Sequence, residues 1–193
     1  MRIGIFGGTF DPPHVGHLLA ATDAYEALSL DRVLFVPAAG QPLKSAIVAA
    51  PRDRLAMVER LVGDDPRFAV DPIEIERGGL SYTVDTLRAL RERWQSSGGG
   101  DLALILLLGA DAAATLPQWR EPGAVASLAE VVVLQRAGGA EEQAPPAGGK
   151  AIDTRRVDVS STEIRERVRA GKSIRGFVPE SVAAYIAERR LYR

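Results

Sequence analysis

The two histidines of the chain, His14 and His17, lie three residues apart in a segment rich in glycine and proline, 7–18. This segment follows a short apolar run, 3–6, which predicts the order strand, glycine-rich turn and helix. Such a turn brings backbone N–H groups and both imidazoles to the carboxyl end of a strand, where nucleotides bind in open α/β sheets. Histidines spaced i, i+3 lie on one helix face and can reach one anion. The alternative is a histidine at a helix start with a second, solvated one beside it, but the preceding glycines and the lack of other histidines favour phosphate binding.

A second candidate site lies near the C-terminus, at the start of a helix predicted over 161–170. Ser160 and Glu163 have the S-x-x-E spacing of a capping box, which alone predicts only a well-capped amphipathic helix. Arg165 in the first turn opposes the helix dipole, and an incoming polyphosphate would explain it better than local stability does. The candidate phosphate contacts here are Ser160, Ser161, Thr162 and Arg165.

The elements that must position these segments alternate between strands and helices. The expected strands are 2–6, 32–36, 68–75, 103–108, 131–134 and 151–157. The expected helices are 16–28, 51–62, 83–94, one or two turns within 122–129, 161–170 and 179–190. The runs 103–108 and 131–134 are almost entirely apolar, as expected when both faces of a parallel sheet are covered. The alternation predicts an α/β fold, a Rossmann-like doubly wound parallel sheet in three αβα layers, with a small C-terminal helical part.

Composition fits a globular protein of one domain, 1–193, with 46% hydrophobic and 25% charged residues. The net charge of −1 gives no general attraction to nucleic acid or to a membrane. From residue 151 onward, ten Lys and Arg face six Asp and Glu, so this part carries +4 and permits a local anion site. The absence of cysteine excludes disulfides, thiolate zinc sites and a thiol nucleophile.

Neither a signal peptide nor a membrane-spanning run is evident, so a cytoplasmic location is expected. The segment 137–149 is rich in Gly, Pro, Ala and Glu, and is expected to form a flexible surface loop.

The segments GGTFDPPHVGHLL and VSSTEIRERV together resemble the nucleotidyltransferases of the HxGH type, and more narrowly the bacterial nicotinate-nucleotide adenylyltransferases. Four further segments resemble that family in the same order: FVPAAGQPLK, GGLSYTVDTLRAL, LLGADAAATLPQWREP and GKSIRGFVPESVAAYI. The resemblance therefore covers nearly the whole chain. The HxGH motif also occurs in class I aminoacyl-tRNA synthetases, but those are much longer and carry a lysine-rich second signature that this chain lacks.

The resemblance implies transfer of AMP from ATP to nicotinate mononucleotide, with release of pyrophosphate. No protein nucleophile is required, because the mononucleotide phosphate is already ionised and attacks directly; the protein positions two polyanions and neutralises charge. His14 and His17 would contact the ATP phosphates, with His17 stabilising charge at the α-phosphate. Lys44 and Arg165 would hold the β- and γ-phosphates. The other residues expected on the ATP side are Gly7, Gly8, Thr9, Phe10, Gly109, Asp111, Ser160, Ser161 and Thr162.

Mg²⁺ is expected to arrive with ATP, held mostly by water, and no protein metal site is expected. Asp11, between Phe10 and Pro12, is interpreted as a turn residue that caps its own backbone rather than as a metal ligand. Gly8 is expected to allow close approach of phosphate to the backbone.

For the pyridine nucleotide, the resemblance implies stacking of the nicotinate ring on Trp119, although a tryptophan there could equally cover the core. Tyr82, Thr83 and Thr86 lie at a predicted helix start whose N–H groups could receive the nicotinate carboxylate. The Asp111 carboxylate could accept hydrogen bonds from the ribose or from the protein groups that bind the pyridine ring.

The chain departs from the family pattern in one loop. Where the family often has Pro-Pro-His-Lys after a polar residue, this chain has Pro42-Leu43-Lys44 and Ala38. The resemblance therefore does not define which residues line the mononucleotide pocket here, or the substrate preference that depends on them.

The alternative functions are those of an adenylyltransferase that acts on nicotinamide mononucleotide or phosphopantetheine, and of a non-catalytic nucleotide-binding sensor. Oligomeric state is also open, with a homo-oligomer as one option.

Overall fold

A computed structural model describes residues 1–41, 47–136 and 149–193 of the chain. The predictions for Leu43, for Lys44 and for nearly all of the loop 137–149 lie outside these residues. Six parallel strands form one sheet in the order β3-β2-β1-β4-β5-β6. They are β1 (Arg2–Gly8), β2 (Arg32–Pro37), β3 (Phe68–Val70), β4 (Ala103–Gly109), β5 (Glu130–Arg136) and β6 (Lys150–Thr154). The chain builds outward from β1 in both directions, so the switch point lies between β1 and β4.

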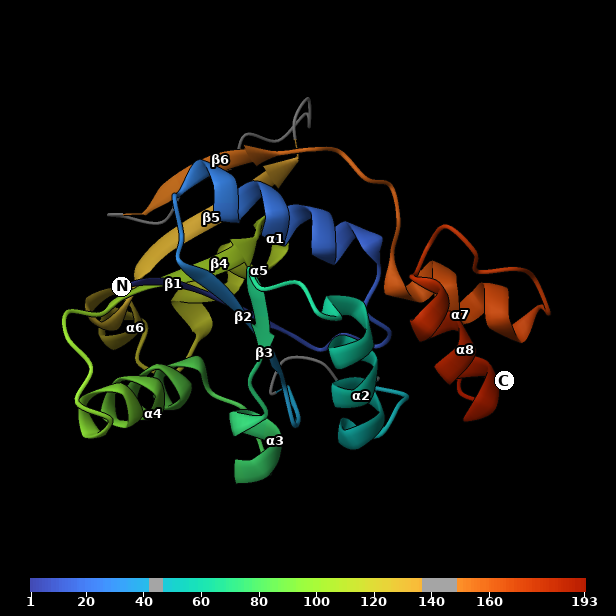
Figure 1. Cartoon of the computed structure of the whole chain (residues 1–193), viewed down its shortest axis with the longest axis horizontal. Coiled ribbons are helices and arrows are strands. Elements are labelled where there is room, and N and C mark those ends of the chain that lie inside the picture. The colour runs from blue at the N-terminus through green and yellow to red at the C-terminus, as the bar shows by residue number, and fades with distance from the viewer. Residues whose placement is uncertain (42–46, 137–148) are drawn as a thin grey trace.

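Helices cover both faces of the sheet, as Figure 1 shows. They are α1 (Val15–Ala27), α2 (Pro51–Val62), α3 (Ile73–Arg77), α4 (Thr83–Ser96), α5 (Ala110–Thr115), the 3-10 turn η1 (Leu116–Gln118), α6 (Pro122–Leu128), α7 (Ser161–Arg169) and α8 (Glu180–Glu188). Alternate residues of β4 point to opposite faces: Ile105 packs in the cluster that contains α1, α2, α7 and α8, and Leu106 in the cluster that contains α4, α5 and α6. The predicted three-layer α/β fold is confirmed.

The predicted strand 68–75 is wrong beyond Val70. The carboxylate of Asp71 accepts a hydrogen bond from the backbone N–H of Ile73 at 3.1 Å, and Pro72 has no N–H to donate to a neighbouring strand. The chain therefore leaves the sheet and forms the short helix α3. The helix α5 and the turn η1 were also absent from the prediction, because their alanines and Leu-Pro carry little periodic signal.

Strand β6 ends at Thr154 rather than at residue 157. Arg155 turns toward α1, where its backbone N–H donates to Asp23 Oδ2 at 2.8 Å and its guanidinium contacts the same carboxylate at 2.6 Å. Together the two bonds draw the chain away from the sheet at this residue.

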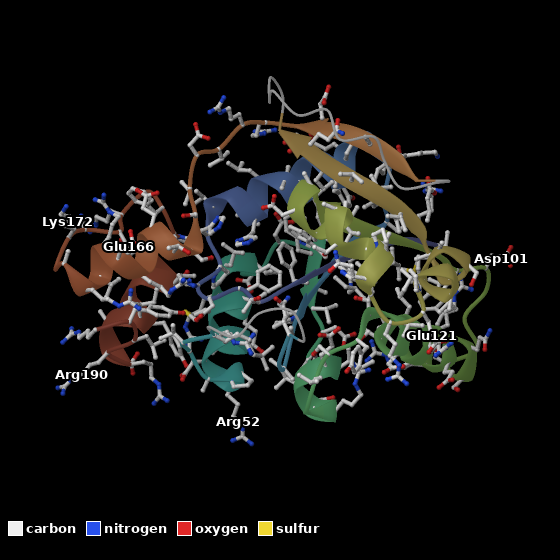
Figure 2. The ribbon with its side chains drawn as sticks, turned by 180° about the vertical axis from the view of Figure 1, so that it is seen from behind. Arg52, Asp101, Glu121, Glu166, Lys172 and Arg190 are labelled. Atoms are coloured by element: carbon white, nitrogen blue, oxygen red, sulfur yellow. The ribbon has the colours of Figure 1, made fainter. Side chains whose placement is uncertain are left out.

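The small C-terminal helical part packs on α2, where Tyr185 of α8 donates to Asp53 Oδ1 at 2.8 Å. Figure 2 shows Lys172 and Arg190 at the outer end of this part, on the opposite side of the molecule from Glu121.

Within the described ranges, no helix is both long and apolar enough to cross a membrane.

Candidate active site

The candidate site lies at the carboxyl edge of the sheet, next to the switch point. Strand β1 ends at Gly8 and its neighbour β4 ends at Gly109, and the two run in the same direction. The loops after both strands therefore emerge side by side, and the loop after β1 leads directly into α1 through His14. This is the position at which open α/β sheets bind ligands.

The two imidazoles lie against each other, with ring centroids 3.7 Å apart and ring planes 31° apart. His14 precedes the first residue of α1 and is only 8% exposed. A Cβ atom at Gly16 would lie 3.0 Å from His14 Nδ1, so glycine at this position leaves room for the His14 ring. The predicted proximity of the two rings is confirmed, and the glycine between them in the HxGH motif has a steric reason.

A backbone hydrogen bond orients the ring of His17. The N–H of His14 donates to His17 Nδ1 at 3.1 Å. Because Nδ1 accepts, the neutral imidazole carries its proton on Nε2 and can donate it to a ligand. The Phe10 ring packs edge-on against the His17 ring, with centroids 5.1 Å apart. His17 is thus oriented with Nε2 as the ring nitrogen that can donate a hydrogen bond.

Phe10 itself is buried, with 2% of its surface exposed, and its backbone has a left-handed φ of 52°. Its ring belongs to the apolar core, so only its backbone could contact ATP. The same ring explains Gly8, because a Cβ atom there would lie 2.9 Å from Phe10 Cζ. The expected reason for this glycine, close approach of phosphate, is therefore accompanied by a packing reason that the sequence did not reveal.

We expect Gly8→Ala to destabilise the fold and to lower turnover. The added methyl group would meet a buried ring that is packed against the rings of Phe6, His17 and Phe35, and such overpacking typically costs about 1–3 kcal/mol. Gly7→Ala is the matched control, since a Cβ atom there meets nothing within 4 Å. Thermal unfolding of the two variants measures the packing effect, for which Gly7→Ala is the control; an equal loss of stability in both variants would contradict the packing argument.

The start of α7 lies on the loop that follows β1, although the two segments are far apart in sequence. The hydroxyl of Ser161 donates to the carbonyl of Pro12 at 2.8 Å, and Arg165 Nη1 donates to the carbonyl of Asp11 at 2.8 Å. Arg165 Nη2 donates to Thr162 Oγ1 at 3.1 Å. The two candidate phosphate-binding segments predicted from the sequence are thus brought together.

The capping interpretation of Ser160 is confirmed, because its side chain accepts a hydrogen bond from the N–H of Glu163 at 3.1 Å. The hydroxyls of Ser160, Ser161 and Thr162 therefore all have partners within the protein. By contrast, Thr9 Oγ1 and Arg165 Nε are buried and lack a hydrogen-bond partner in the part of the chain that the structure describes.

Arg54, on α2, is a residue of the site region that sequence reasoning missed. Its side chain is fully buried and donates to three backbone carbonyls, those of Thr9 at 2.7 Å, Ala39 at 2.9 Å and Ala49 at 3.2 Å. Burial lowers the pKa of its guanidinium, and the nearby carboxylate of Asp11 opposes that shift. The sequence did indicate that Arg54 is buried, because it lies at helical spacing on the same face of α2 as the apolar residues Met57 and Leu61.

Asp11 is buried, and its carboxylate binds elsewhere than expected. Oδ2 accepts from the N–H of Val48 at 2.8 Å, and Oδ1 accepts from the N–H of Ala49 at 3.0 Å and from the hydroxyl of Tyr192 at 2.8 Å. The expectation that Asp11 caps its own backbone is therefore wrong, because its partners are distant in sequence. Among the residues that the structure describes, no group of three or more His, Cys, Asp or Glu could hold a metal ion.

The residues predicted for the pyridine nucleotide lie around the start of α4. Tyr82 and Thr83 are half-buried there. Thr86 is buried, and its hydroxyl donates to Glu74 Oε1 at 2.7 Å and accepts from Arg77 Nη2 at 3.1 Å. The buried Thr86 hydroxyl therefore links α4 to α3. Because it is buried and already has these two partners, it is not placed for direct contact with a substrate.

A hydrogen-bonded pair of loops lies next to this helix start. The N–H of Ala39, after β2, donates to Ser81 Oγ at 3.0 Å, and the N–H of Ser81 donates to the carbonyl of Gly40 at 2.8 Å. Burial raises the pKa of the Glu74 carboxyl beneath them, while hydrogen bonds from Thr86 and Ser81 act in the opposite direction. The loop after β2 and the start of α4 thus form one supported surface.

Trp119 follows η1 and is half-buried against the apolar cluster around α4 and α6. Its Nε1–H donates to Thr115 Oγ1 at 3.0 Å, which fixes the plane of the indole ring. The guanidinium of the next residue, Arg120, lies 5.0 Å from the centre of the Tyr82 ring. Trp119 and the start of α4 are therefore close, whereas Asp111 is exposed in the first turn of α5.

Comparison with known proteins gives a consistent picture. The family model described as Cytidylyltransferase-like matches residues 5–167. A relative from Gemmatimonas aurantiaca, described as a "probable nicotinate-nucleotide adenylyltransferase", is 51% identical over 206 residues, which cover 100% of this chain and 93% of the relative. A relative with the same description from Thermus thermophilus is 44% identical over 194 residues, with 100% of both chains covered.

A solved structure of Plasmodium falciparum nicotinic acid mononucleotide adenylyltransferase complexed with NaAD has a TM-score of 0.77 to this chain at 16% sequence identity. The alignment covers 99% of this chain and 97% of that one. At this level of identity, the similarity shows a common fold.

Proposed function

The chain belongs to the cytidylyltransferase-like family and, within it, to the nicotinate-nucleotide adenylyltransferases, and from this premise we propose its reaction and the roles of its residues. The protein transfers AMP from ATP to nicotinate mononucleotide, giving nicotinate adenine dinucleotide and pyrophosphate, a step of NAD biosynthesis. The observation that carries the assignment of the site is the close pair of imidazoles, His14 and His17, on a loop to which Arg165 is hydrogen-bonded at Asp11, at the carboxyl edge of the sheet.

The transfer is a single displacement at the α-phosphorus of ATP. An oxygen of the mononucleotide phosphate attacks, the bond from the α-phosphorus to the bridging oxygen breaks, and pyrophosphate leaves with the electron pair. The nucleophile is ionised before it binds, so the protein need not remove a proton. His17 Nε2–H would donate to the α-phosphate, where negative charge develops, and the stacked His14 would contact the phosphates beside it.

The other phosphate contacts would come from residues at the start of α7. Arg165 donates from Nη1 to the carbonyl of Asp11 and from Nη2 to the hydroxyl of Thr162. Its remaining N–H groups, including that of the buried Nε, are suited to the β- and γ-phosphates. Thr9 Oγ1 and the backbone of 7–10 would line the same phosphates. Lys44 is proposed as a second cation for the leaving pyrophosphate. Mg²⁺ would be carried by ATP and held largely by water; Asp11 is an unsuitable ligand, because its carboxylate already accepts three hydrogen bonds.

The mononucleotide would bind between Trp119 and the start of α4. The indole plane, fixed by Thr115, offers a stacking surface for the pyridine ring. The N–H groups of Thr83 and its neighbours at the first turn of the fourteen-residue helix α4 would receive the nicotinate carboxylate. Because the neutral amide of nicotinamide mononucleotide satisfies these donors poorly, the site favours nicotinate mononucleotide.

The cytoplasmic location and a homo-oligomeric state remain predictions.

The experiment that tests this proposal compares pyrophosphate release from ATP and Mg²⁺ with four acceptors: nicotinate mononucleotide, nicotinamide mononucleotide, phosphopantetheine and water. We expect kcat/KM for the acid to exceed that for the amide by about 100-fold, since a charge-assisted hydrogen bond and the dipole interaction are lost. Equal rates with both mononucleotides would contradict carboxylate recognition at α4. Release with phosphopantetheine alone would overturn the assigned substrate, and release with none would favour a nucleotide sensor.

A further inference from the structure

Tyr192, the penultimate residue of the chain, is buried in the core beneath the candidate active site. Only 4% of its surface is exposed, and its hydroxyl lies 3.9 Å from Met57 Sδ of α2. Its backbone has a left-handed φ of 63°, and that of Arg190 has 51°. Residues other than glycine hold this conformation when the surrounding contacts impose it. The end of the chain, beside α8 in Figure 1, is thus turned inward to bring one phenol group into the molecule.

The group that receives this phenol is the carboxylate of Asp11. Tyr192 donates to Oδ1 at 2.8 Å, and the N–H groups of Val48 and Ala49, just before α2, donate to the same carboxylate at 2.8 and 3.0 Å. The backbone carbonyl of Asp11 accepts from Arg165 Nη1 at 2.8 Å. Asp11 therefore joins the C-terminal end of the chain, the segment before α2 and the candidate phosphate-binding arginine.

Asp11 is also close in sequence to the histidine pair. Only two prolines separate it from His14, and proline fixes its own φ, so this short stretch of backbone has little freedom to absorb a displacement. The N–H of His14 in turn holds His17 Nδ1. A shift of Asp11 would thus move both the imidazoles and the Arg165 contact together.

We propose that Tyr192 is a positioning residue for adenylyl transfer, an inference that rests on the function proposed above: its hydroxyl holds Asp11, and through Asp11 it sets the relative positions of Arg165 and the histidine pair. Tyr192 does not touch the substrates. Its hydrogen bond contributes to turnover because the phosphate-binding groups must be placed correctly in the transition state, where an error of about 1 Å can cost up to roughly 100-fold in rate.

The surroundings of Tyr192 keep its hydroxyl in the donor form. Burial and the neighbouring carboxylate of Asp11 raise the pKa of the phenol far above its usual range, while Arg165 and Arg54 act in the opposite direction. The phenol thus remains protonated throughout the neutral pH range and donates to Asp11 at every pH at which the reaction is measured.

The test compares Tyr192→Phe with Tyr185→Phe. The first variant removes one hydroxyl and keeps the buried ring. The second is a matched control, because Tyr185 also donates to a carboxylate near the start of α2, Asp53 Oδ1, at the same distance of 2.8 Å. That contact lies outside the proposed site. Both variants lose one tyrosine–carboxylate hydrogen bond, so thermal unfolding shows how much stability each bond contributes.

We expect Tyr192→Phe to lower kcat about ten-fold with the KM for nicotinate mononucleotide unchanged, and Tyr185→Phe to leave both constants unchanged. A second readout does not depend on turnover. Because the chain has two histidines, its imidazole ¹H–¹³C spectrum contains signals from these residues alone. Tyr192→Phe should shift the signals of His14 and His17, and Tyr185→Phe should leave them in place.

A wild-type kcat and unshifted histidine signals in Tyr192→Phe, with only a lower unfolding temperature, would overturn the positioning role. Failure of the proposed function looks different, because the wild-type protein would then release no pyrophosphate with any mononucleotide. In that case the histidine signals alone still decide whether Tyr192 positions the pair.

Discussion

Replacing His17 with alanine is expected to lower kcat by roughly 10²–10³ while ATP still binds. The reason lies in the orientation of the ring. Because Nδ1 accepts from the His14 backbone at 3.1 Å, Nε2 carries the proton that would meet the charge developing at the α-phosphate. Such a donor contributes more to the transition state than to the bound ground state, so turnover should fall much more than affinity. Initial rates of pyrophosphate release and calorimetric ATP titration measure the two quantities.

The companion variant His17→Gln separates loss of a donor from loss of packing. A glutamine amide can place an N–H group near the position of Nε2, so this variant should retain more turnover than His17→Ala. Turnover unchanged in His17→Ala would refute the electrostatic role. A loss of ATP binding that fully accounts for the lower rate would instead assign His17 to ground-state binding.

The second large effect is expected for Arg54→Met, which should lower the free energy of unfolding by about 3–5 kcal/mol. Arg54 is fully buried and donates to the carbonyls of Thr9, Ala39 and Ala49. Methionine approximates the length and the apolar part of the side chain but leaves these three carbonyls, one buried and two partly buried, without their donor. Because the loops after β1 and β2 share this arginine, turnover should fall as well.

Arg52→Met is the matched control for this prediction. Arg52 lies on the same helix, and Figure 2 shows its side chain directed outward, away from the body of the molecule. Exposed substitutions of this kind usually change stability by less than about 0.5 kcal/mol. Urea unfolding of both variants gives the comparison. A similar small change in the two would mean that the carbonyls find other donors and that Arg54 does not organise the site.

Much of the fold could be predicted from local patterns. The continuous apolar runs of β4 and β5 predicted strands buried on both faces, and the periodicity of α2 gave its observed bounds, Pro51–Val62. The prediction failed where a single polar side chain redirects the backbone. At β3 this residue is Asp71, which binds the N–H of Ile73, and at β6 the residue is Asp23, which binds Arg155 from 132 positions away in sequence.

The same distinction holds for the candidate site. Segments whose spacing has a local meaning, such as the histidine pair and the cap at Ser160, could be found from the sequence because their partners are three residues away. The contacts of Arg54 and of Asp11 could not be found in this way. Their partners are backbone groups or a tyrosine up to 181 positions away, and no periodic pattern encodes them. The predictions that concern Lys44 fall outside the residues that the structure describes.

The measurement that tests the account most directly follows the α-phosphate of ATP. ATP labelled at that phosphorus is incubated with Mg²⁺, nicotinate mononucleotide and the protein, and the label is then located. We predict one labelled dinucleotide for each pyrophosphate released, with no label on the denatured protein. Label that remains bound to the protein, or that appears as free AMP without the mononucleotide, would contradict direct transfer between the two substrates.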